Sequence, residues 1–440
     1  MKKYILIILC CLTSFPLWSY NVNMIVEHYS VDQGLPNNTV NCTLKDRDGF
    51  IWFGTWYGLC CFDGVKFKTF NKQEHDSDVP PRKIQRIVED KNGYIWVKTI
   101  DRKLYVFNKV TECFHAVYDD MKNYSENIQV IKLQNTAEGD VLLLTKDKNL
   151  LLAGVDEKGQ VTIKILFDSR DEINKHDYTL KHHVLCETEE YISWIGTDYK
   201  VSAVHKGAEL ASRPADFITS KINSGDKDSF TSFFEDGRKV WVGDRAGIFY
   251  SIDVRTGLVN RYVLSEIKGA ISNLLVTPAG YVYLSVAGQG TYEYDLAERR
   301  LQKINTEMND AMVTHAFIDQ YDKIWFHENE KALIYYDPLN HTAKRFPFTM
   351  FGKITTLYSE DAGERGLFFL SPAGEAWLFD REHVEMVYIN KLKQLSNDRA
   401  NQQFYHLMLD NDGVLWLSSA DEGVYCMNFP KKQFNLLSLS

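Results

Sequence analysis

The chain has 440 residues, of which 45% are hydrophobic and 13% aromatic, so it is long enough to bury a large core and is not intrinsically disordered. Its net charge of −9 at pH 7 argues against nucleic acid as a partner, because proteins that bind phosphate backbones carry basic surfaces. The composition therefore predicts one large repeat domain, or two.

The first 19 residues have the pattern of a secretory signal peptide. Lys2 and Lys3 precede an apolar run from Tyr4 to Leu12, and a small residue, Ser19, is suited to cleavage. The run is shorter than the roughly 20 residues that a membrane helix needs. We expect residues 1–19 to be removed and the mature chain to be exported to the periplasm.

One sequence unit recurs along the rest of the chain. It consists of an apolar run, a polar turn related to Asp-x-x-Gly, and a second apolar run that usually contains a tryptophan. The tryptophan position recurs at intervals of 42 to 52 residues, at Trp52, Trp96, Leu142, Trp194, Trp241, Tyr283, Trp325, Phe369 and Trp416. Repeats of about 40 to 50 residues with four short strands each predict an all-β fold, a β-propeller.

The first unit shows the design most clearly. Val40 to Leu44 is predicted as an inner strand, Asp46 to Gly49 as a turn, and Phe50 to Gly54 as the second strand. The aspartates are expected to cap the turns, because the 12-residue loop of a calcium site with its terminal Glu is missing. The tryptophans are expected to fill the space between neighbouring blades. We predict neither a metal nor a cofactor.

Nine units exceed the roughly 4 to 8 blades of an ordinary propeller. We therefore predict a seven-bladed propeller over residues 20–345 and an incomplete second propeller over residues 346–440. A single, unusually large ring is the alternative. The segment Ile25 to Ser30 resembles an outer strand without a blade of its own, and we expect it to complete a blade far downstream.

Cys60 and Cys61 are adjacent on a predicted strand, where successive side chains point to opposite faces. Ordinary packing is the simpler interpretation. A strained vicinal disulfide is the alternative, and the sequence leaves the redox state open.

The segment His28 to Phe70, HYSVDQGLPNNTVNCTLKDRDGFIWFGTWYGLCCFDGVKFKTF, resembles the opening of the periplasmic sensor region of hybrid two-component systems in gut Bacteroidetes. The repeats are similar to the two-component regulator propeller units of that family. The resemblance implies an exported, non-catalytic sensor that binds a glycan-derived oligosaccharide and controls genes for carbohydrate use through a histidine kinase region. It also implies a possible homodimer, whereas the chain itself contains no kinase motif.

Binding residues are expected on one rim of the propeller, because loops on a rigid scaffold carry function. This rim is formed by the turns between second and third strands and by the loops that enter the inner strands. Aromatic rings suit the faces of sugars, and polar or basic groups suit hydroxyls, uronates or sulfates. Exposed Trp56 and Tyr57 are the strongest candidates. The full set is Trp56, Tyr57, Arg82, Arg102, Lys146, Tyr199, Lys200, Arg245, Gln289 and His327.

Two other classes of function fit the same fold. A propeller enzyme, such as a lyase or a glycosidase-like protein, would need histidines such as His182, His183, His315 and His327 to converge with an acid, and no residue pattern places a base beside a nucleophile. No catalytic residue is therefore predicted. A protein-interaction propeller without a small ligand would show a flat, apolar rim.

Overall fold

The computed structural model describes residues 25–428 except 71, 74–79, 123–127, 148, 168–184, 188–189, 196–200, 207–214, 217–229, 305–312, 329–330, 352–357, 362–365, 372–374 and 392–403. The predicted signal segment 1–19 lies outside the described residues. None of the helices in the described part of the chain has the length and apolarity needed to cross a membrane.

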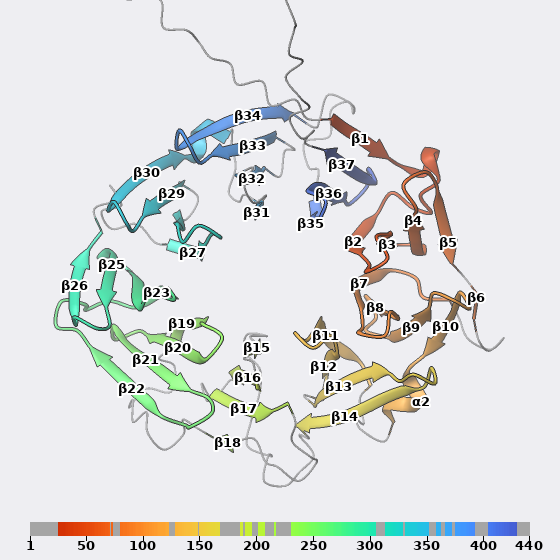
Figure 1. Ribbon diagram of the computed structural model, residues 1–440, viewed down its shortest axis with the longest axis horizontal. Helices are drawn as coiled ribbons and strands as arrows, with labels where there is room; N and C mark the ends of the chain where they lie inside the picture. The colour runs from red at the N-terminus through yellow and green to blue at the C-terminus, as the bar shows by residue number, and fades with distance from the viewer. Residues whose placement is uncertain are drawn as a thin grey trace, which may run out of the picture.

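The described residues form nine sheets, or blades, arranged around one ring (Figure 1). Each blade runs from an inner strand near the ring centre to an outer strand at the periphery. Blade 1 consists of β2 (Val40–Lys45), β3 (Ile51–Thr55), β4 (Gly58–Phe62) and β5 (Phe67–Phe70). Blade 2 consists of β7 (Ile84–Glu89), β8 (Ile95–Thr99), β9 (Leu104–Asn108) and β10 (Cys113–Ala116), with β6 (Lys72–Gln73) added outside. Blade 3 consists of β11 (Val130–Asn135), β12 (Val141–Thr145), β13 (Leu150–Val155) and β14 (Val161–Phe167).

The next blades continue around the ring in the same order. Blade 4 consists of β15 (Leu185–Glu187), β16 (Tyr191–Ile195), β17 (Val201–His205) and β18 (Ala215–Asp216). Blade 5 consists of β19 (Phe230–Glu235), β20 (Lys239–Asp244), β21 (Ile248–Asp253) and β22 (Val259–Val263). Blade 6 consists of β23 (Ile271–Val276), β24 (Tyr281–Val286), β25 (Gly290–Asp295) and β26 (Arg300–Lys303).

The last blades bring the chain back to its start. Blade 7 consists of β27 (Val313–Ile318), β28 (Ile324–Glu328), β29 (Ala332–Asp337) and β30 (Thr342–Pro347). Blade 8 consists of β31 (Tyr358–Asp361), β32 (Leu367–Leu370), β33 (Glu375–Asp380) and β34 (Glu385–Lys391). Blade 9 consists of β35 (Phe404–Leu409), β36 (Val414–Ser419), β37 (Val424–Asn428) and β1 (Ile25–Tyr29). The described helices are single turns: η1 (Val31–Gln33), α2 (Tyr118–Met121) and η3 (Phe348–Phe351).

The first strand closes the ring, as the sequence predicted. β1 pairs antiparallel with β37, from Ile25 opposite Asn428 to Tyr29 opposite Val424. The ring of His28 stacks on Tyr425 with centroids 4.5 Å apart. Segments from the two ends of the described chain therefore share one blade.

The buried side chains of the described residues form nine clusters, one at each junction between successive blades. At the junction of blades 9 and 1, the ring of Trp416 contacts Phe53 and Phe62 at centroid distances of 5.8 and 6.0 Å. The predicted role of the tryptophans as spacers between blades is confirmed at this junction and at that of blades 1 and 2, where Trp52 contacts Phe107.

The propeller fold is confirmed, but the blades are not divided as expected. The predicted boundary at residue 345 falls within β30, and the cluster of blades 7 and 8 continues across it, with Trp325 packed against Phe369 and Phe379. Every junction is filled, including that of blades 9 and 1. The chain therefore follows the alternative, one ring of nine blades, and not a seven-bladed propeller with the start of a second.

Aspartates hold the turns between first and second strands and also anchor the tryptophans. Asp46 Oδ1 accepts hydrogen bonds from the backbone N–H groups of Asp48 and Phe50, while its Oδ2 accepts one from Trp52 Nε1 at 2.8 Å. The same bond from indole to carboxylate recurs at Trp96–Asp90, Trp241–Asp236, Trp325–Asp319 and Trp416–Asp410. In blade 3, where Leu142 replaces the tryptophan, Thr136 stands in place of the aspartate. The predicted capping is confirmed, and each carboxylate binds the indole as well.

Candidate functional site

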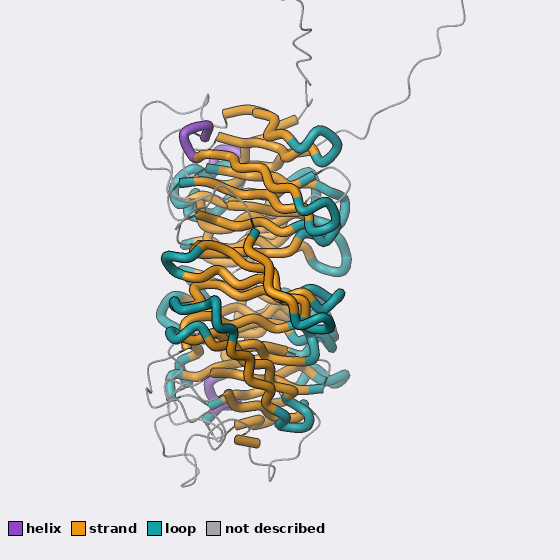
Figure 2. The backbone as a smooth tube through the Cα atoms, turned by 90° about the vertical axis from the view of Figure 1, so that its left-hand side faces the viewer, coloured by secondary structure: helices purple, strands orange, loops and turns teal. Residues whose placement is uncertain are grey.

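The strand order gives the ring two distinct faces, visible edge-on in Figure 2. We name the face that carries the turns between second and third strands the Trp56 face, because Trp56 and Tyr57 form the turn between β3 and β4. The opposite face carries the turns between first and second strands and is named the Asp46 face. The rim predicted from the sequence is the Trp56 face.

Backbone hydrogen bonds connect neighbouring blades along the Trp56 face. The N–H of Lys83, at the entrance to β7, donates to the carbonyl of Trp56 at 2.9 Å, and the carbonyl of Lys83 accepts from Ile100 at 2.9 Å. In the next step, the N–H of Val130 in blade 3 donates to the carbonyl of Arg102. The turns of blades 1 and 2 and the entrance to blade 3 therefore form a continuous, fixed surface.

Two exposed aromatic side chains lie on this surface. Trp56 is 37% exposed and Tyr57 is 61% exposed. The ammonium of Lys83 lies over the Trp56 ring, 5.2 Å from its centroid, which is a cation–π geometry. Lys83 and Arg102 also have positive φ angles of 51° and 68°, a conformation that costs free energy in residues other than glycine and is frequent at functional sites.

Three arginines of this surface lack carboxylate partners among the described residues, whereas Lys103 pairs with Asp101 at 3.5 Å. Within the described part of the chain, the side chains of Arg82, Arg86 and Arg102 make no ion pair or hydrogen bond. Arg86 lies on β7 directly opposite Lys98 of β8. Burial, and then the nearby guanidinium groups of Arg102 and Arg86, lower the pKa of Lys98 to about 8. The surface therefore combines exposed rings with uncompensated positive charge.

The predicted site residues do not form one site. Trp56, Arg82 and Arg102 lie together on blades 1 and 2, with exposed Lys146 on the neighbouring blade 3. Arg245 and Gln289 belong to blades 5 and 6, on the other side of the ring in Figure 1. Tyr199 and Lys200 lie outside the described residues.

Two predicted residues are already engaged within the protein. The side-chain amide of Gln289 accepts from the N–H of Lys268 at 2.7 Å and donates to the carbonyl of Glu266 at 3.0 Å, so it fastens the loop that enters β23. His327 was expected in a loop but lies within β28, opposite His315, with Nδ1 2.9 Å from Thr314 Oγ1. That placement corrects the prediction, because the second strand of blade 7 extends through Glu328.

The two histidines do not form an acid–base pair with a carboxylate in the described residues. Their ring centroids are 6.1 Å apart, and burial followed by the proximity of His315 lowers the pKa of His327. His182 and His183, which a lyase would also have to use, lie outside the described residues. Buried Cys60 and Cys61 are both free thiols, so the vicinal disulfide is not formed, and burial raises the pKa of Cys61 to about 12.

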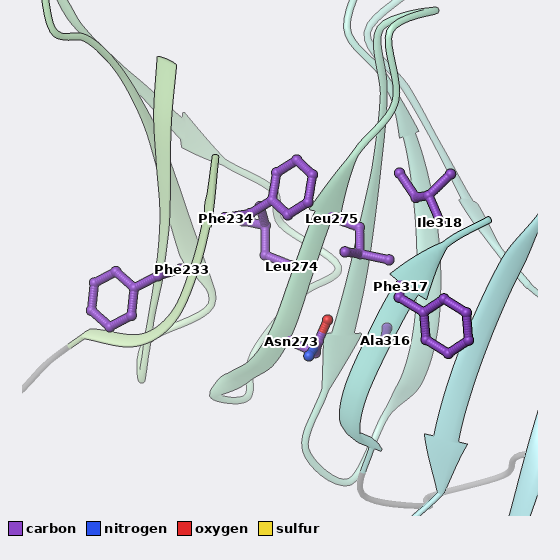
Figure 3. A pocket seen from close by; sticks show the side chains of 8 residues that line it. All are labelled: Phe233, Phe234, Asn273, Leu274, Leu275, Ala316, Phe317 and Ile318. Atoms are coloured by element: carbon purple, nitrogen blue, oxygen red, sulfur yellow. The ribbon is translucent and has the colours of Figure 1, made fainter. Parts of the chain in front are cut away.

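A hollow lies on the inner strands of blades 5 to 7, where sequence reasoning placed no site. Its volume is about 330 Å³, near the lower end of the range for ligand pockets. Figure 3 shows a mainly apolar lining in which the Asn273 amide is the polar group. The lining consists of Phe233, Phe234, Asn273, Leu274, Leu275, Ala316, Phe317 and Ile318.

Comparison with known proteins gives one family match and several structural likenesses. Among solved structures, the chain is similar to the extracellular domains of a one component system and of a hybrid two component system, both from B. thetaiotaomicron. Each is 14% identical, with TM-scores of 0.38 and 0.34. The alignments cover 92% and 94% of this chain but 66% and 61% of those domains.

Another likeness is to virginiamycin B lyase from Staphylococcus aureus, at 8% identity and a TM-score of 0.36, covering 93% of this chain and 100% of that enzyme. Comparison with curated proteins found no match. The family described as "Two component regulator propeller" matches residues 34–57. This matched segment ends with the two exposed aromatic residues, Trp56 and Tyr57.

Proposed function

We propose that this protein is an exported, non-catalytic sensor that binds a glycan-derived oligosaccharide on the Trp56 face and passes occupancy to a histidine kinase region that controls carbohydrate-utilisation genes. The observation that carries the proposal is the pair of exposed aromatic residues within the family match, flanked by cations without partners. Sugar rings stack on such aromatic faces, while guanidinium and ammonium groups donate hydrogen bonds to hydroxyl and acidic groups.

The rigidity of the surface supports a sensing role. Because backbone hydrogen bonds join Trp56, Lys83 and Ile100 across two blades, a ligand that contacts both turns would change how those blades are held relative to each other. A change in conformation requires different ligand affinities for two states. Contacts that span a junction between blades are suited to produce such a difference.

The proposal is tested by thermal unfolding of the full chain with a panel of neutral and acidic oligosaccharides. A ligand at about 100 times its Kd stabilises the folded protein by about 2.7 kcal/mol, which gives a measurable rise in Tm. The rise should disappear in the double variant Trp56→Ala, Tyr57→Ala and persist in Tyr388→Ala, which removes an exposed tyrosine from the outer strand β34. A rise that survives the double variant would refute binding at the Trp56 face.

The apolar hollow on blades 5 to 7 offers a second candidate, an apolar ligand or peptide side chain bound near the ring centre. A Tm rise that persists in the double variant but disappears on replacement of Asn273 by Leu would favour that hollow.

A further inference from the structure

Lys98 is a buried, charged residue at a position where most of the described blades have a small residue and where blades 3 and 7 have the larger Leu144 and His327. It stands two residues after the tryptophan position, where the polypeptides of neighbouring blades approach closely. In blade 1 this position is Gly54, and a Cβ there would lie 2.6 Å from Ile84 Cγ2 of blade 2. Blade 5 has Gly243, whose added Cβ would lie 2.8 Å from Ile271 Cγ2, and further blades have the buried serines Ser285, Ser371 and Ser418. Blade 2 has a lysine that is only 6% exposed.

Cohesion between the blades does not require the charge of this lysine. Lys98 Nζ donates to the carbonyl of Ile131 in blade 3 at 2.6 Å and to Gln85 Oε1 at 2.8 Å. Equivalent bonds between blades are made by neutral groups elsewhere. Asn41 Nδ2 donates to the carbonyl of Ile84 at 2.6 Å, and Thr231 Oγ1 donates to that of Ile271 at 2.7 Å. A neutral side chain would therefore suffice to hold blades 2 and 3 together.

The surroundings of Lys98 accumulate positive charge without compensation. Arg86 lies directly opposite Lys98 on the neighbouring strand β7. Arg102 lies in the turn between β8 and β9, and its N–H donates to the carbonyl of Thr99. Neither guanidinium has a partner within the described residues, and no carboxylate bonds to Lys98 there. An ammonium has three donors, and the protein uses two of those of Lys98. Burying an amine among other cations is costly unless an anion completes the group.

On the Asp46 face, a partly buried cation, Lys109, is neutralised by carboxylates. Lys109 Nζ lies 3.0 Å from Asp46, 2.7 Å from Asp48 and 2.8 Å from Glu89. These carboxylates form a cluster of the kind that holds metals, but the ammonium is in contact with all of them. Charge neutralisation is therefore available on one face and missing around Lys98 on the other.

We propose that Lys98, Arg86 and Arg102 form a subsite for an anionic group, the carboxylate of a uronic acid or a sulfate ester, carried by the ligand of the Trp56 face. This inference rests on the proposed function and defines its substrate class as acidic oligosaccharides. Arg102 connects the subsite to the aromatic residues, because its turn contains Ile100, whose N–H donates to the carbonyl of Lys83 beside Trp56.

The experiment is isothermal titration calorimetry on the full chain with matched pairs of probes. One pair is trigalacturonate and its methyl ester, which differ in the carboxylate charge; the other is a galactan trisaccharide with and without sulfate esters. Inorganic sulfate at constant ionic strength is a third probe. The variants are Lys98→Met and Arg102→Gln, with Lys158→Met as the matched control, a lysine exposed on the Asp46 face of blade 3. Arg102→Gln changes an exposed side chain, so it keeps the test valid if Lys98→Met folds poorly.

We expect one charged probe to bind at least about tenfold more tightly than its neutral partner, since a hydrogen bond to a charged group is worth about a factor of 10 to 100. Both variants should abolish that preference, and Lys158→Met should retain it. The pair that shows the preference identifies the carboxylate or the sulfate. If charged and neutral probes bind equally and this binding is lost in the Trp56→Ala, Tyr57→Ala variant, the anionic subsite is refuted. The proposed sugar sensor would still be supported. Binding of inorganic sulfate that depends on Lys98, without binding of any sugar, would support the subsite and overturn the sugar sensor.

Discussion

The Asp46 face and the part of the Trp56 face on blades 1 and 2 differ in how many of their cations have carboxylate partners. On the Asp46 face, five cations are paired across junctions between blades: Lys45 with Asp410, Lys109 with Asp46, Lys91 with Asp140, Lys206 with Glu138, and Arg381 with Asp319. Lys109 and Lys206 also pair within their own blades, with Glu89 and Glu187. On the Trp56 face of blade 2, Arg82 and Arg102 are unpaired within the described residues, and Lys83 contacts only a ring.

This difference indicates a division of roles. Paired charges and indole–carboxylate bonds fasten neighbouring blades on the Asp46 face, whereas unpaired cations and exposed aromatic rings contribute little to folding. Groups that do not stabilise the fold are available to a ligand. Variants on the two faces should therefore differ sharply in whether they affect stability or binding.

The largest expected effect is on the Asp46 face. Asp46→Ala removes the acceptor of Trp52 Nε1, of two backbone N–H groups and of Lys109. It should lower the free energy of unfolding by about 3–5 kcal/mol, because breaking a buried ion pair leaves uncompensated groups. Urea denaturation measures the loss. Asp412→Ala, at a carboxylate whose side chain is 78% exposed, is the control and should cost less than about 1 kcal/mol. Equal losses would contradict the anchoring role of Asp46.

Lys109→Met should have the next largest effect, a loss of about 2–3 kcal/mol at neutral pH. Although burial lowers the pKa of Lys109, its bonds to Asp48, Glu89 and Asp46 raise it above the usual range overall. Lys109 also lowers the pKa of Asp48. The stability that the Asp48 carboxylate contributes is therefore fully present above its usual pKa, and it is lost as the pH falls through the lowered pKa. The difference between variant and wild type should therefore shrink in acid, as urea denaturation at a series of pH values would show. A constant difference would refute this coupling.

Lys98→Met should act in the opposite direction and stabilise the protein by about 1 kcal/mol at pH 7, since it removes a buried, uncompensated charge. The pKa of Lys98 is about 8 in the folded chain and 10.5 ordinarily. Below pH 8, therefore, the free-energy cost of burying the charged ammonium is fully present. As pH rises from about 8 to 10.5 the unfolded chain retains more protons, and wild-type stability should increase relative to the variant. Thermal unfolding at pH 7, 9 and 10.5 measures this change. A destabilised variant at pH 7 would contradict the assignment of Lys98 as a cost to folding.

The smallest effect on stability is expected from the double variant Trp56→Ala, Tyr57→Ala. Both side chains are exposed, so unfolding should change by no more than about 0.5 kcal/mol. A much larger loss in urea denaturation would mean that these rings serve the fold, and it would remove the contrast between the faces.

Much of this architecture was predictable because it is local. Four-stranded units, Asp-capped turns with Gly49 in the left-handed region, and tryptophans between blades follow from residue types at fixed spacing. The closing role of Ile25 to Tyr29 was also predictable, because an outer strand without a blade must pair elsewhere. For the site, the same reasoning located Trp56, Tyr57, Arg82 and Arg102 on one face.

The tertiary structure alone decided how many blades share one ring and which charges lack partners. The size of the ring depends on the angle that side-chain packing sets between successive blades. The residues of a junction such as that of Trp325 with Phe379 have the same sequence pattern whether the junction lies within one propeller or between two. Lys98 reads in sequence as an ordinary strand residue between Val97 and Thr99, and its burial becomes evident only when blade 3 covers it. The sequence determined the unit and its turns through local hydrogen bonding and apolar patterning. Closure and uncompensated charge arise from contacts between residues far apart in the chain, so only the assembled ring revealed them.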